Sequence, residues 1–326
     1  MAKRITKKPS EASSGRAAKI ATPDASTDPI KHIVVLMFEN RSFDQMLGGL
    51  QVRCPQLDGS IPAGDLRVNE DKEGRFYQQL PLTAEMLRRE IGYDPKHEHP
   101  NVMYQLYDPG RGNNQNFVRD FSWEHPGSSE IERQYIMSYY PADSLPVLHQ
   151  LAGQFTICDK WFSSVPGPTW ANRLFMYGGT SQGTVRMPEN DLDPILHHVR
   201  ISFDMDTVFD RLSEGDINWK VYFHDYALSS NLIPRLALQH YANFRNFQQF
   251  EDDVSGGDDG FPGFSLIEPR YLYSHQEDDY NEPDLNYPPN DCHPPHSVFD
   301  GEHLLAKVYN ALQRSHVGFN VAGGAF

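Results

Sequence analysis

Cysteine is scarce in this sequence. Its three cysteines, Cys54, Cys158 and Cys292, are far apart, and no two of them form a C-x-x-C pair. This excludes a disulfide framework and a thiolate zinc site, because both need several closely placed cysteines. Few and unpaired cysteines fit a reducing compartment best.

Long apolar segments are also missing. Nowhere do about eighteen consecutive apolar residues occur, so no transmembrane helix is predicted. Residues 1–29 are mainly Lys, Ser, Ala, Thr and Pro, without the apolar run of a signal peptide. We therefore predict a disordered, mildly basic tail over 1–29 and a cytoplasmic protein.

Basic residues are outnumbered as well. The chain has 29 Lys and Arg against 44 Asp and Glu, which gives a formal net charge of −15. This charge repels phosphate backbones and anionic lipid headgroups, so nucleic acid is not an expected partner. A small or zwitterionic phosphate-containing substrate is compatible with it. The 326 residues, 39% of them hydrophobic, suffice for one large α/β domain or two small ones.

What is present is organised around residues 31–49, KHIVVLMFENRSFDQMLGG. Its unbroken apolar run, 33–38, predicts a strand buried on both faces by helices, as in a parallel α/β sheet. Glu39 and Asn40 follow at once. Because such sheets place ligands beyond the carboxyl ends of their strands, this carboxylate and amide could hold a hard cation. Alternatively, they cap the helix that follows.

Further along the chain, the patterns predict short helices over 83–90 and 145–152 and a strand over 155–162. The loop YDPKHEHP places His97 and His99 on one side of an extended segment. Histidines there act as ligands or acids, or are simply solvated.

The segment PGPTWANR is a tight turn running into a helix. It puts the Thr169 hydroxyl at a helix N-terminus, which favours phosphate or an ionised alkoxide. With a cation to lower its pKa, Thr169 is a candidate nucleophile. Asn172 and Arg173 could hold phosphoryl oxygens one turn on. The simpler alternative makes Thr169 an N-cap and Arg173 a surface charge.

In combination, ENRSFDQMLGG, DPKHEHP and FSSVPGPTWANRLFMYGGTSQG resemble the bacterial phosphoesterase family that contains phosphatidylcholine-type phospholipases C and a group of acid phosphatases. The resemblance extends from about Pro29 to Leu312 and includes FSLIEPRY and NDCHPPHSVFDGEHLLAKVYNAL. It implies one domain over 30–326, an alkaline-phosphatase-like α/β/α sandwich around a mostly parallel sheet. It also implies hydrolysis of a phosphodiester such as phosphatidylcholine through a phosphorylated threonine.

Residue by residue, the resemblance implies that Glu39, Asn40 and Thr169 bind a divalent metal, with Thr169 also the nucleophile. Calcium, magnesium, manganese and zinc all suit such oxygen ligands. His97 and His293 match histidines that contact phosphate or protonate the leaving group.

Other side chains are weaker candidates. His224 and His296 are expected to be structural rather than catalytic. A choline headgroup would suit an aromatic cage, but the expectation for the available aromatics is that they are core or ordinary surface residues. These aromatics are Tyr139, Tyr140, Trp161 and Trp170.

The sequence departs from the family after the helix predicted over 302–313. There the family continues with a buried strand and an Asp-Glu-His-Gly-Gly type motif, whose acidic pair completes the metal site. This chain instead reads SHVGFNVAGGAF. We therefore expect a sandwich that is incomplete at the C-terminus, weak metal affinity and an exposed sheet edge. Acidic pairs at 252/253, 258/259 and 278/279 are predicted to lie in solvated loops.

Two alternative functions stay open at this point. One is an acid phosphatase that acts on phosphomonoesters, and the other is a catalytically dead remnant. The expected partner is a phospholipid or small phosphoester, with peripheral membrane contact at most. Relatives of this kind that act on lipids are often exported, so secretion without a cleaved signal is the alternative to the cytoplasm.

Overall fold

We describe the chain from a computed structural model, which covers residues 30–58, 67–89, 91–108, 112–187, 203–257, 260–272, 287–315 and 322–324. The tail predicted over 1–29 and the acidic pairs at 258/259 and 278/279 lie outside these residues. All the helices and strands belong to one unit, residues 32–326.

Four parallel strands form the central sheet. They are β1 (Ile33–Leu36), β9 (Phe264–Glu268), β7 (Trp219–Phe223) and β8 (Phe244–Asn246), in the spatial order β1-β9-β7-β8. Val35 lies opposite Leu266, which in turn lies opposite Val221. The apolar run after Lys31 forms a parallel strand as predicted, but only over Ile33–Leu36. Because β1 is an edge strand, Ile33 is exposed and the other three residues are half-buried, so the predicted burial on both faces is not reached.

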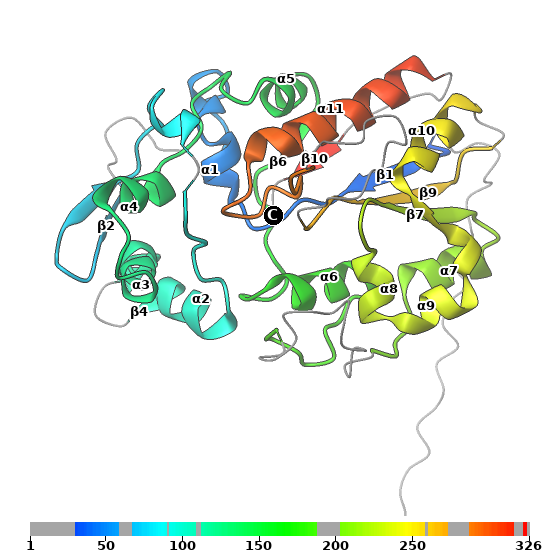
Figure 1. Cartoon of the computed structure of the whole chain (residues 1–326), viewed down its shortest axis with the longest axis horizontal. Coiled ribbons are helices and arrows are strands. Elements are labelled where there is room, and N and C mark those ends of the chain that lie inside the picture. The colour runs from blue at the N-terminus through cyan, green and yellow to red at the C-terminus, as the bar shows by residue number, and fades with distance from the viewer. Residues whose placement is uncertain are drawn as a thin grey trace, which may run out of the picture. The chain divides into compact units, whose positions relative to one another are not determined.

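Helices cover both faces of the sheet (Figure 1). Alternate residues of β1 point to opposite faces. Val34 and Leu36 pack with α10 (Phe247–Ser255) and α11 (Val298–Arg314), whereas Val35 packs on the other side. That side is covered by α6 (Thr169–Gly178), α7 (Val208–Glu214), α8 (Leu228–Leu232) and α9 (Pro234–Gln239). The chain is thus an α/β protein with a four-strand parallel sheet flanked by helices.

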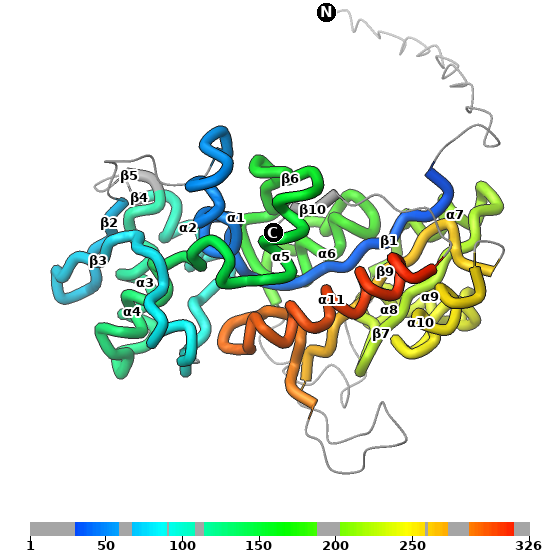
Figure 2. Tube along the Cα trace, turned by 90° about the horizontal axis from the view of Figure 1, so that it is seen from above, coloured from blue at the N-terminus to red at the C-terminus, as the bar shows by residue number. Residues whose placement is uncertain are grey.

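A second group of elements packs around its own apolar cluster, which includes Leu47, Phe121, Tyr140 and Leu145. Figure 2 shows most of these elements beyond the end of β1, whereas the last of them packs beside α11. They are α1 (Phe43–Leu47), η1 (Leu50–Val52), β2 (Val68–Glu70), β3 (Phe76–Gln78), η2 (Met86–Arg88), α2 (His99–Leu106), β4 (Tyr107–Asp108), β5 (Gly112–Asn113), α3 (Phe117–Glu124), α4 (Glu130–Met137) and α5 (Pro146–Gln154).

Several local predictions are corrected. The helix predicted over 83–90 is only the 3-10 turn η2, and the strand predicted over 155–162 is only β6 (Thr156–Cys158). Asp252 and Asp253 lie within α10 rather than in a loop. The Asp253 carboxylate accepts hydrogen bonds from Lys220 and Tyr222, whereas Asp252 is exposed. A three-residue strand, β10 (Ala322–Gly324), pairs in parallel with β6, where no strand was expected.

Candidate active site

The chain leaves β1 at the carboxyl edge of the sheet and delivers two polar side chains there. Glu39 is buried, and its backbone N–H donates to the Asp291 carbonyl at 2.8 Å. Asn40 has a φ of +52°, which turns the chain sharply. Neither side chain caps α1, because Ser42 is its N-cap and accepts from the Gln45 amide. The capping alternative for Glu39 and Asn40 is therefore wrong.

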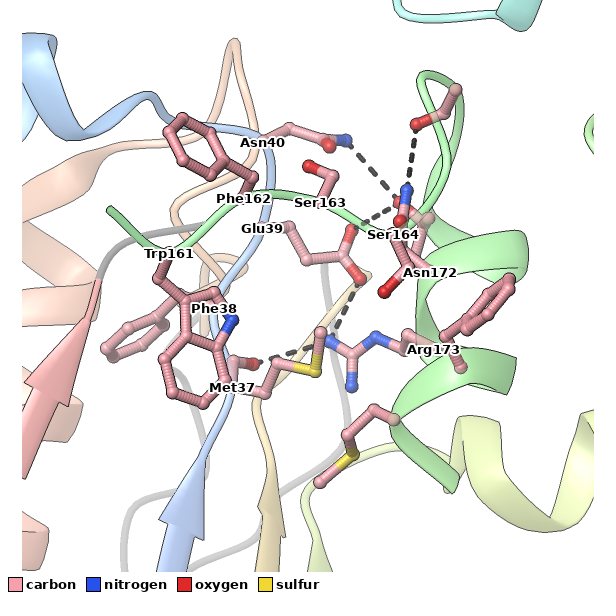
Figure 3. A pocket seen from close by; sticks show the side chains of 14 residues that line it. Met37, Phe38, Glu39, Asn40, Trp161, Phe162, Ser163, Ser164, Asn172 and Arg173 are labelled. Atoms are coloured by element: carbon pink, nitrogen blue, oxygen red, sulfur yellow. Dashed lines mark hydrogen bonds and ion pairs between the residues drawn. The ribbon is translucent and has the colours of Figure 1, made fainter. Parts of the chain in front are cut away.

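Thr169 reaches the same place from the first turn of α6. The helix is preceded by Pro168, which provides no side-chain cap. Thr169 Oγ1 lies 3.3 Å from Glu39 Oε2, to which it donates, and 3.4 Å from Asn40 Nδ2 (Figure 3). Three polar side chains from two distant segments thus converge, and Thr169 is not a capping residue.

The turn before α6 is fixed by Asn172. Its amide accepts from the Val165 N–H at 3.0 Å and donates to the carbonyls of Val165, Gly167 and Pro168. This pattern occupies both ends of the amide. Asn172 therefore holds the loop that presents Thr169, and its predicted contact with phosphate stays a prediction.

Arg173 is a fully buried charge near the site. It is not a surface residue, because its relative exposure is 0%. Its guanidinium forms ion pairs of 3.0 Å with Glu39 and 3.0 Å with Glu268 at the end of β9. Its predicted contact with phosphoryl oxygens also stays a prediction.

A group of three side chains lies beside this site. Asp94, His97 and His293 can bring one ligand atom each to within 4.8 Å of one another, so they could hold a metal ion. Backbone contacts bring the 290s segment here: the Glu39 N–H donates to Asp291, and Arg41 Nε donates to the Cys292 carbonyl at 2.8 Å.

The two histidines make the same kind of hydrogen bond, although their rings lie at 73° to each other with centroids 5.1 Å apart. Nδ1 of His97 lies 3.1 Å from the Pro95 carbonyl, and Nδ1 of His293 lies 2.6 Å from the Pro294 carbonyl. Since a carbonyl only accepts, each Nδ1 carries a proton and each Nε2 is left to bind a ligand or exchange a proton. Burial raises the pKa of Asp94, although His293 and His97 act to lower it.

The weaker histidine candidates have structural contacts. His224 Nδ1 lies 3.2 Å from the Glu268 carbonyl, and its ring stacks on Phe247 with centroids 4.4 Å apart. His296 forms a 2.8 Å ion pair with Asp291.

A cavity of about 340 Å³ opens next to Thr169. Its lining combines the polar side chains of Glu39, Asn40 and Thr169 with apolar side chains. Figure 3 shows Met37, Phe38, Trp161 and Phe162 among the latter. Trp161 lines the cavity, but Tyr140 and Trp170 are buried in the apolar cores, so the four predicted aromatics form no cage. The remaining lining residues are Ser163, Ser164, Gly167, Asn172, Arg173, Phe175 and Met176.

Two residues near the site were missed by the sequence reasoning. Glu268 ends an apolar strand in the same way as the run that precedes Glu39, so the same signal could have found it. Asp94 belongs to the Asp-Pro pair before His97, and only the fold shows that it faces His293.

A parallel α/β sheet that brings a hydroxyl, a carboxylate and two histidines to its carboxyl edge defines a protein suited to phosphate esters. The comparison with known families agrees. Residues 30–321 match the model of the Phosphoesterase family, and the chain belongs to this family.

The chain is also similar to named phospholipases. It is 29% identical over 307 residues to non-specific phospholipase C3 of Arabidopsis thaliana. The aligned region covers 89% of this chain and 53% of that protein. Non-specific phospholipase C1 of the same plant is 27% identical over 90% of this chain and 51% of its own length. The hemolytic phospholipase C of Pseudomonas aeruginosa is 26% identical over 67% of this chain and 29% of its own length. The chain thus spans about half the length of the plant relatives.

Proposed function

We propose that the chain is a phosphoesterase of the phospholipase C type with an alkaline-phosphatase-like fold, which hydrolyses a phosphodiester such as phosphatidylcholine through a phosphorylated Thr169. The observation that carries this proposal is the approach of Thr169 Oγ1 to Glu39 Oε2 at the first turn of α6. The family and the phospholipase C names of the relatives support the substrate class.

The residues at this point fit a divalent cation. Glu39 and Thr169 offer oxygens, and half a turn of the Asn40 amide replaces its nitrogen by a third oxygen. Such oxygen donors suit calcium, magnesium or manganese, and zinc also accepts carboxylate oxygen. A bound cation supplies positive charge that lowers the pKa of a hydroxyl and neutralises phosphoryl oxygens. Asp94, His97 and His293 are a second group that could hold such an ion.

In the first chemical step, Thr169 Oγ1 attacks phosphorus and the bond from phosphorus to the leaving alkoxide breaks. The hydroxyl proton passes to Glu39 Oε2, which already accepts a hydrogen bond from it. The leaving oxygen takes a proton from Nε2 of His97 or His293, whose ring carries a proton on both nitrogens at the start of this step and keeps the one on Nδ1. The amide groups of the first turn of α6 favour the negative charge of the phosphate.

The second step regenerates the enzyme. Water attacks the phosphothreonine, giving its proton to the same imidazole Nε2, and the bond between phosphorus and Thr169 Oγ1 breaks. The threonine oxygen then recovers the proton held by Glu39. Because each Nδ1 donates to a backbone carbonyl, each ring keeps Nε2 as its exchanging atom through both steps.

The test is hydrolysis of a chromogenic phosphorylcholine diester by the purified chain with Ca²⁺, Mg²⁺, Mn²⁺ or Zn²⁺. We expect Thr169→Ala to lower turnover by about 1,000-fold or more, because losing a nucleophile removes the covalent route. Thr169→Ser is the matched control, since it keeps a hydroxyl at the same place, and it should retain measurable turnover. Both variants should unfold at the same temperature as the unmodified protein.

Other outcomes would point elsewhere. Unchanged turnover in a folded Thr169→Ala protein would reject the proposed nucleophile. Faster hydrolysis of a phosphomonoester than of the choline diester would favour the acid phosphatase alternative. If the folded protein shows no turnover with any of these cations, the chain has the scaffold of the family but not its activity.

We further propose that the substrate is met at a lipid surface by peripheral contact. Within the part of the chain that the structure describes, no helix is long and apolar enough to cross a membrane. Trp161 and Phe162, at the cavity, are 55% and 78% exposed and could contact lipid.

A further inference from the structure

A buried ion-pair chain leads away from Glu39 into the protein. Arg173 Nη2 lies 3.0 Å from Glu39 Oε1, and Nη1 lies 3.0 Å from Glu268 Oε2. Nη2 also donates to the Met37 carbonyl at 3.3 Å. Arg173 and Glu268 both have a relative exposure of 0%. One guanidinium therefore spans two carboxylates in a place that water does not reach.

Glu268 is held on all sides. Its Oε1 accepts from the Tyr177 hydroxyl at 3.2 Å and from the Ser229 N–H at 3.2 Å, while its Oε2 accepts from the Tyr271 hydroxyl at 2.6 Å. Burial raises the pKa of both tyrosines well above the usual range, so they remain protonated donors. Glu268 is consequently held in one position at the carboxyl end of β9.

The charges of this group do not cancel. One arginine faces two carboxylates, so the group keeps one net negative charge. Since Arg173 occupies Oε1 of Glu39, only Oε2 is left to face Thr169. Glu268 draws part of the arginine charge away from Glu39, and thereby leaves Glu39 more able to attract a cation.

We propose that Arg173 and Glu268 are positioning residues, which aim Glu39 Oε2 at Thr169 and set the negative charge available to a divalent cation there. This inference rests on the proposed function, because it concerns the same site. Neither residue needs to touch the substrate. A purely structural ion pair would stabilise the fold but would leave cation affinity unchanged.

The main experiment is titration calorimetry of the full chain with Mn²⁺. We expect Glu268→Gln to weaken Mn²⁺ binding by about tenfold or more, since a neutral amide leaves the whole arginine charge to Glu39. Glu268→Asp should restore most of the affinity because it keeps the charge. The matched control is Asp253→Asn, which removes the same charge at α10 near Lys220, the second residue of β7. It should bind Mn²⁺ as the unmodified protein does.

Arg173→Lys tests separately whether the guanidinium orients Glu39. It also replaces Glu268→Gln as the test if that variant does not fold. A lysine ammonium keeps the charge but cannot span both carboxylates as the planar guanidinium does. We expect it also to weaken Mn²⁺ binding by about tenfold, since Glu39 Oε2 is no longer held toward Thr169. Unchanged affinity in folded Glu268→Gln or in folded Arg173→Lys protein would overturn the proposal.

A metal-free measurement separates this inference from the proposed function. Urea unfolding gives the folding equilibrium constants of Glu39→Gln, Glu268→Gln and the double variant. The change in the double variant should differ by about threefold or more from the product of the two single changes, because both carboxylates share Arg173. If the two substitutions are coupled in unfolding but Glu39→Gln leaves Mn²⁺ affinity unchanged, the ion-pair chain through Arg173 stands and the metal site at Glu39 is rejected. If the two substitutions act independently, the ion-pair chain itself is rejected.

Discussion

At the residue scale, Asn40 illustrates how one side chain serves two purposes. Its φ of +52° lies in the left-handed region, which asparagine tolerates better than most residues. Such a conformation costs about 1–3 kcal/mol when the residue is not glycine. A glycine would adopt it freely but would lose the amide that lies 3.4 Å from Thr169 Oγ1. The turn after β1 therefore favours asparagine for both reasons.

The three cysteines should differ in reactivity. Cys292 is buried, and burial raises the pKa of its thiol to about 12, whereas Cys54 and Cys158 are half-buried. Because the thiolate is the reactive form, Cys292 should react slowly at pH 8. We expect a maleimide to label two thiols in the native protein and the third only in urea. Mass spectrometry of peptides identifies which thiol is slow.

The packing around Cys292 explains its protection. A Cβ on Gly301 of α11 would lie only 2.2 Å from Cys292 Sγ, so the helix backbone covers the sulfur directly. Three thiols that react at one rate in native protein would contradict this arrangement.

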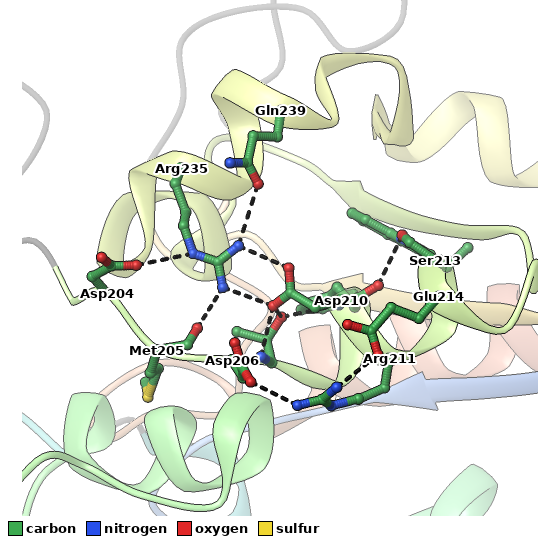
Figure 4. Close-up of polar contacts among 12 residues, drawn as sticks. Asp204, Met205, Asp206, Asp210, Arg211, Ser213, Glu214, Arg235 and Gln239 are labelled. Atoms are coloured by element: carbon green, nitrogen blue, oxygen red, sulfur yellow. Dashed lines mark hydrogen bonds and ion pairs between the residues drawn. The ribbon is translucent and has the colours of Figure 1, made fainter.

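At the scale of elements, α7 and α9 are joined by a polar network (Figure 4). Thr207 and Asp210 form a capping box at the start of α7. Arg235 in α9 donates to both oxygens of the Asp210 carboxylate, at 2.8 and 2.7 Å, and to the Met205 carbonyl. The hydrogen bonds from Arg235 lower the pKa of Asp210 well below its usual range, although burial acts against this.

Asp210→Asn should therefore destabilise the protein in a pH-dependent way. The folded pKa of Asp210 is depressed below the unfolded value of about 3.9, so its contribution is present above that pH and is lost as the pH falls toward the folded pKa. We expect a loss of about 1–3 kcal/mol in the free energy of unfolding at pH 7, and a smaller loss at pH 3. Urea unfolding at both pH values measures it.

The same region supplies a control for this prediction. Glu214 pairs with Arg211 on the surface, where both side chains are solvated. Glu214→Gln should change stability little at either pH, because exposed pairs contribute little. A loss at pH 3 as large as that at pH 7 would contradict the assignment to the Asp210 charge.

Local patterns predicted some elements and failed at others. The apolar run of β1 and the pattern of α5 are strong local signals, and both elements form. Over 83–89 only η2 forms, and its two apolar residues, Met86 and Leu87, are partly buried against the apolar cluster around Leu47. In α10, Phe247, Phe250 and Val254 are buried on one face, so the acidic pair belongs to a helix whose apolar spacing was overlooked.

The candidate site was predictable where its signal was local. Glu39 follows an apolar strand, and Thr169 follows a proline turn at the start of a helix. The pairing of Arg173 with Glu268 could not be read from the sequence, because 95 positions separate them and only the packing of α6 on the sheet brings them together. The same holds for Asp94 and His293.

At the scale of the whole molecule, the parallel sheet gathers polar groups at one edge. Glu39 follows β1, Glu268 ends β9 and His224 follows β7, and all three lie at carboxyl ends of neighbouring strands. The pair Lys220 and Asp253 lies toward the opposite edge. The topology thus separates the site from charges that serve stability alone.

Net charge provides the last prediction. The chain carries −15 overall, although residues 1–29 hold six basic and three acidic residues. Because like charges repel, it should sediment with phosphatidylcholine vesicles at least as well as with vesicles that also contain phosphatidylserine. The difference should shrink as salt rises from about 0.1 to about 1 M, since the Debye length falls from about 10 to about 3 Å. Tighter binding to the anionic vesicles at low salt would instead mean that the basic segment, rather than the net charge, governs contact with lipid.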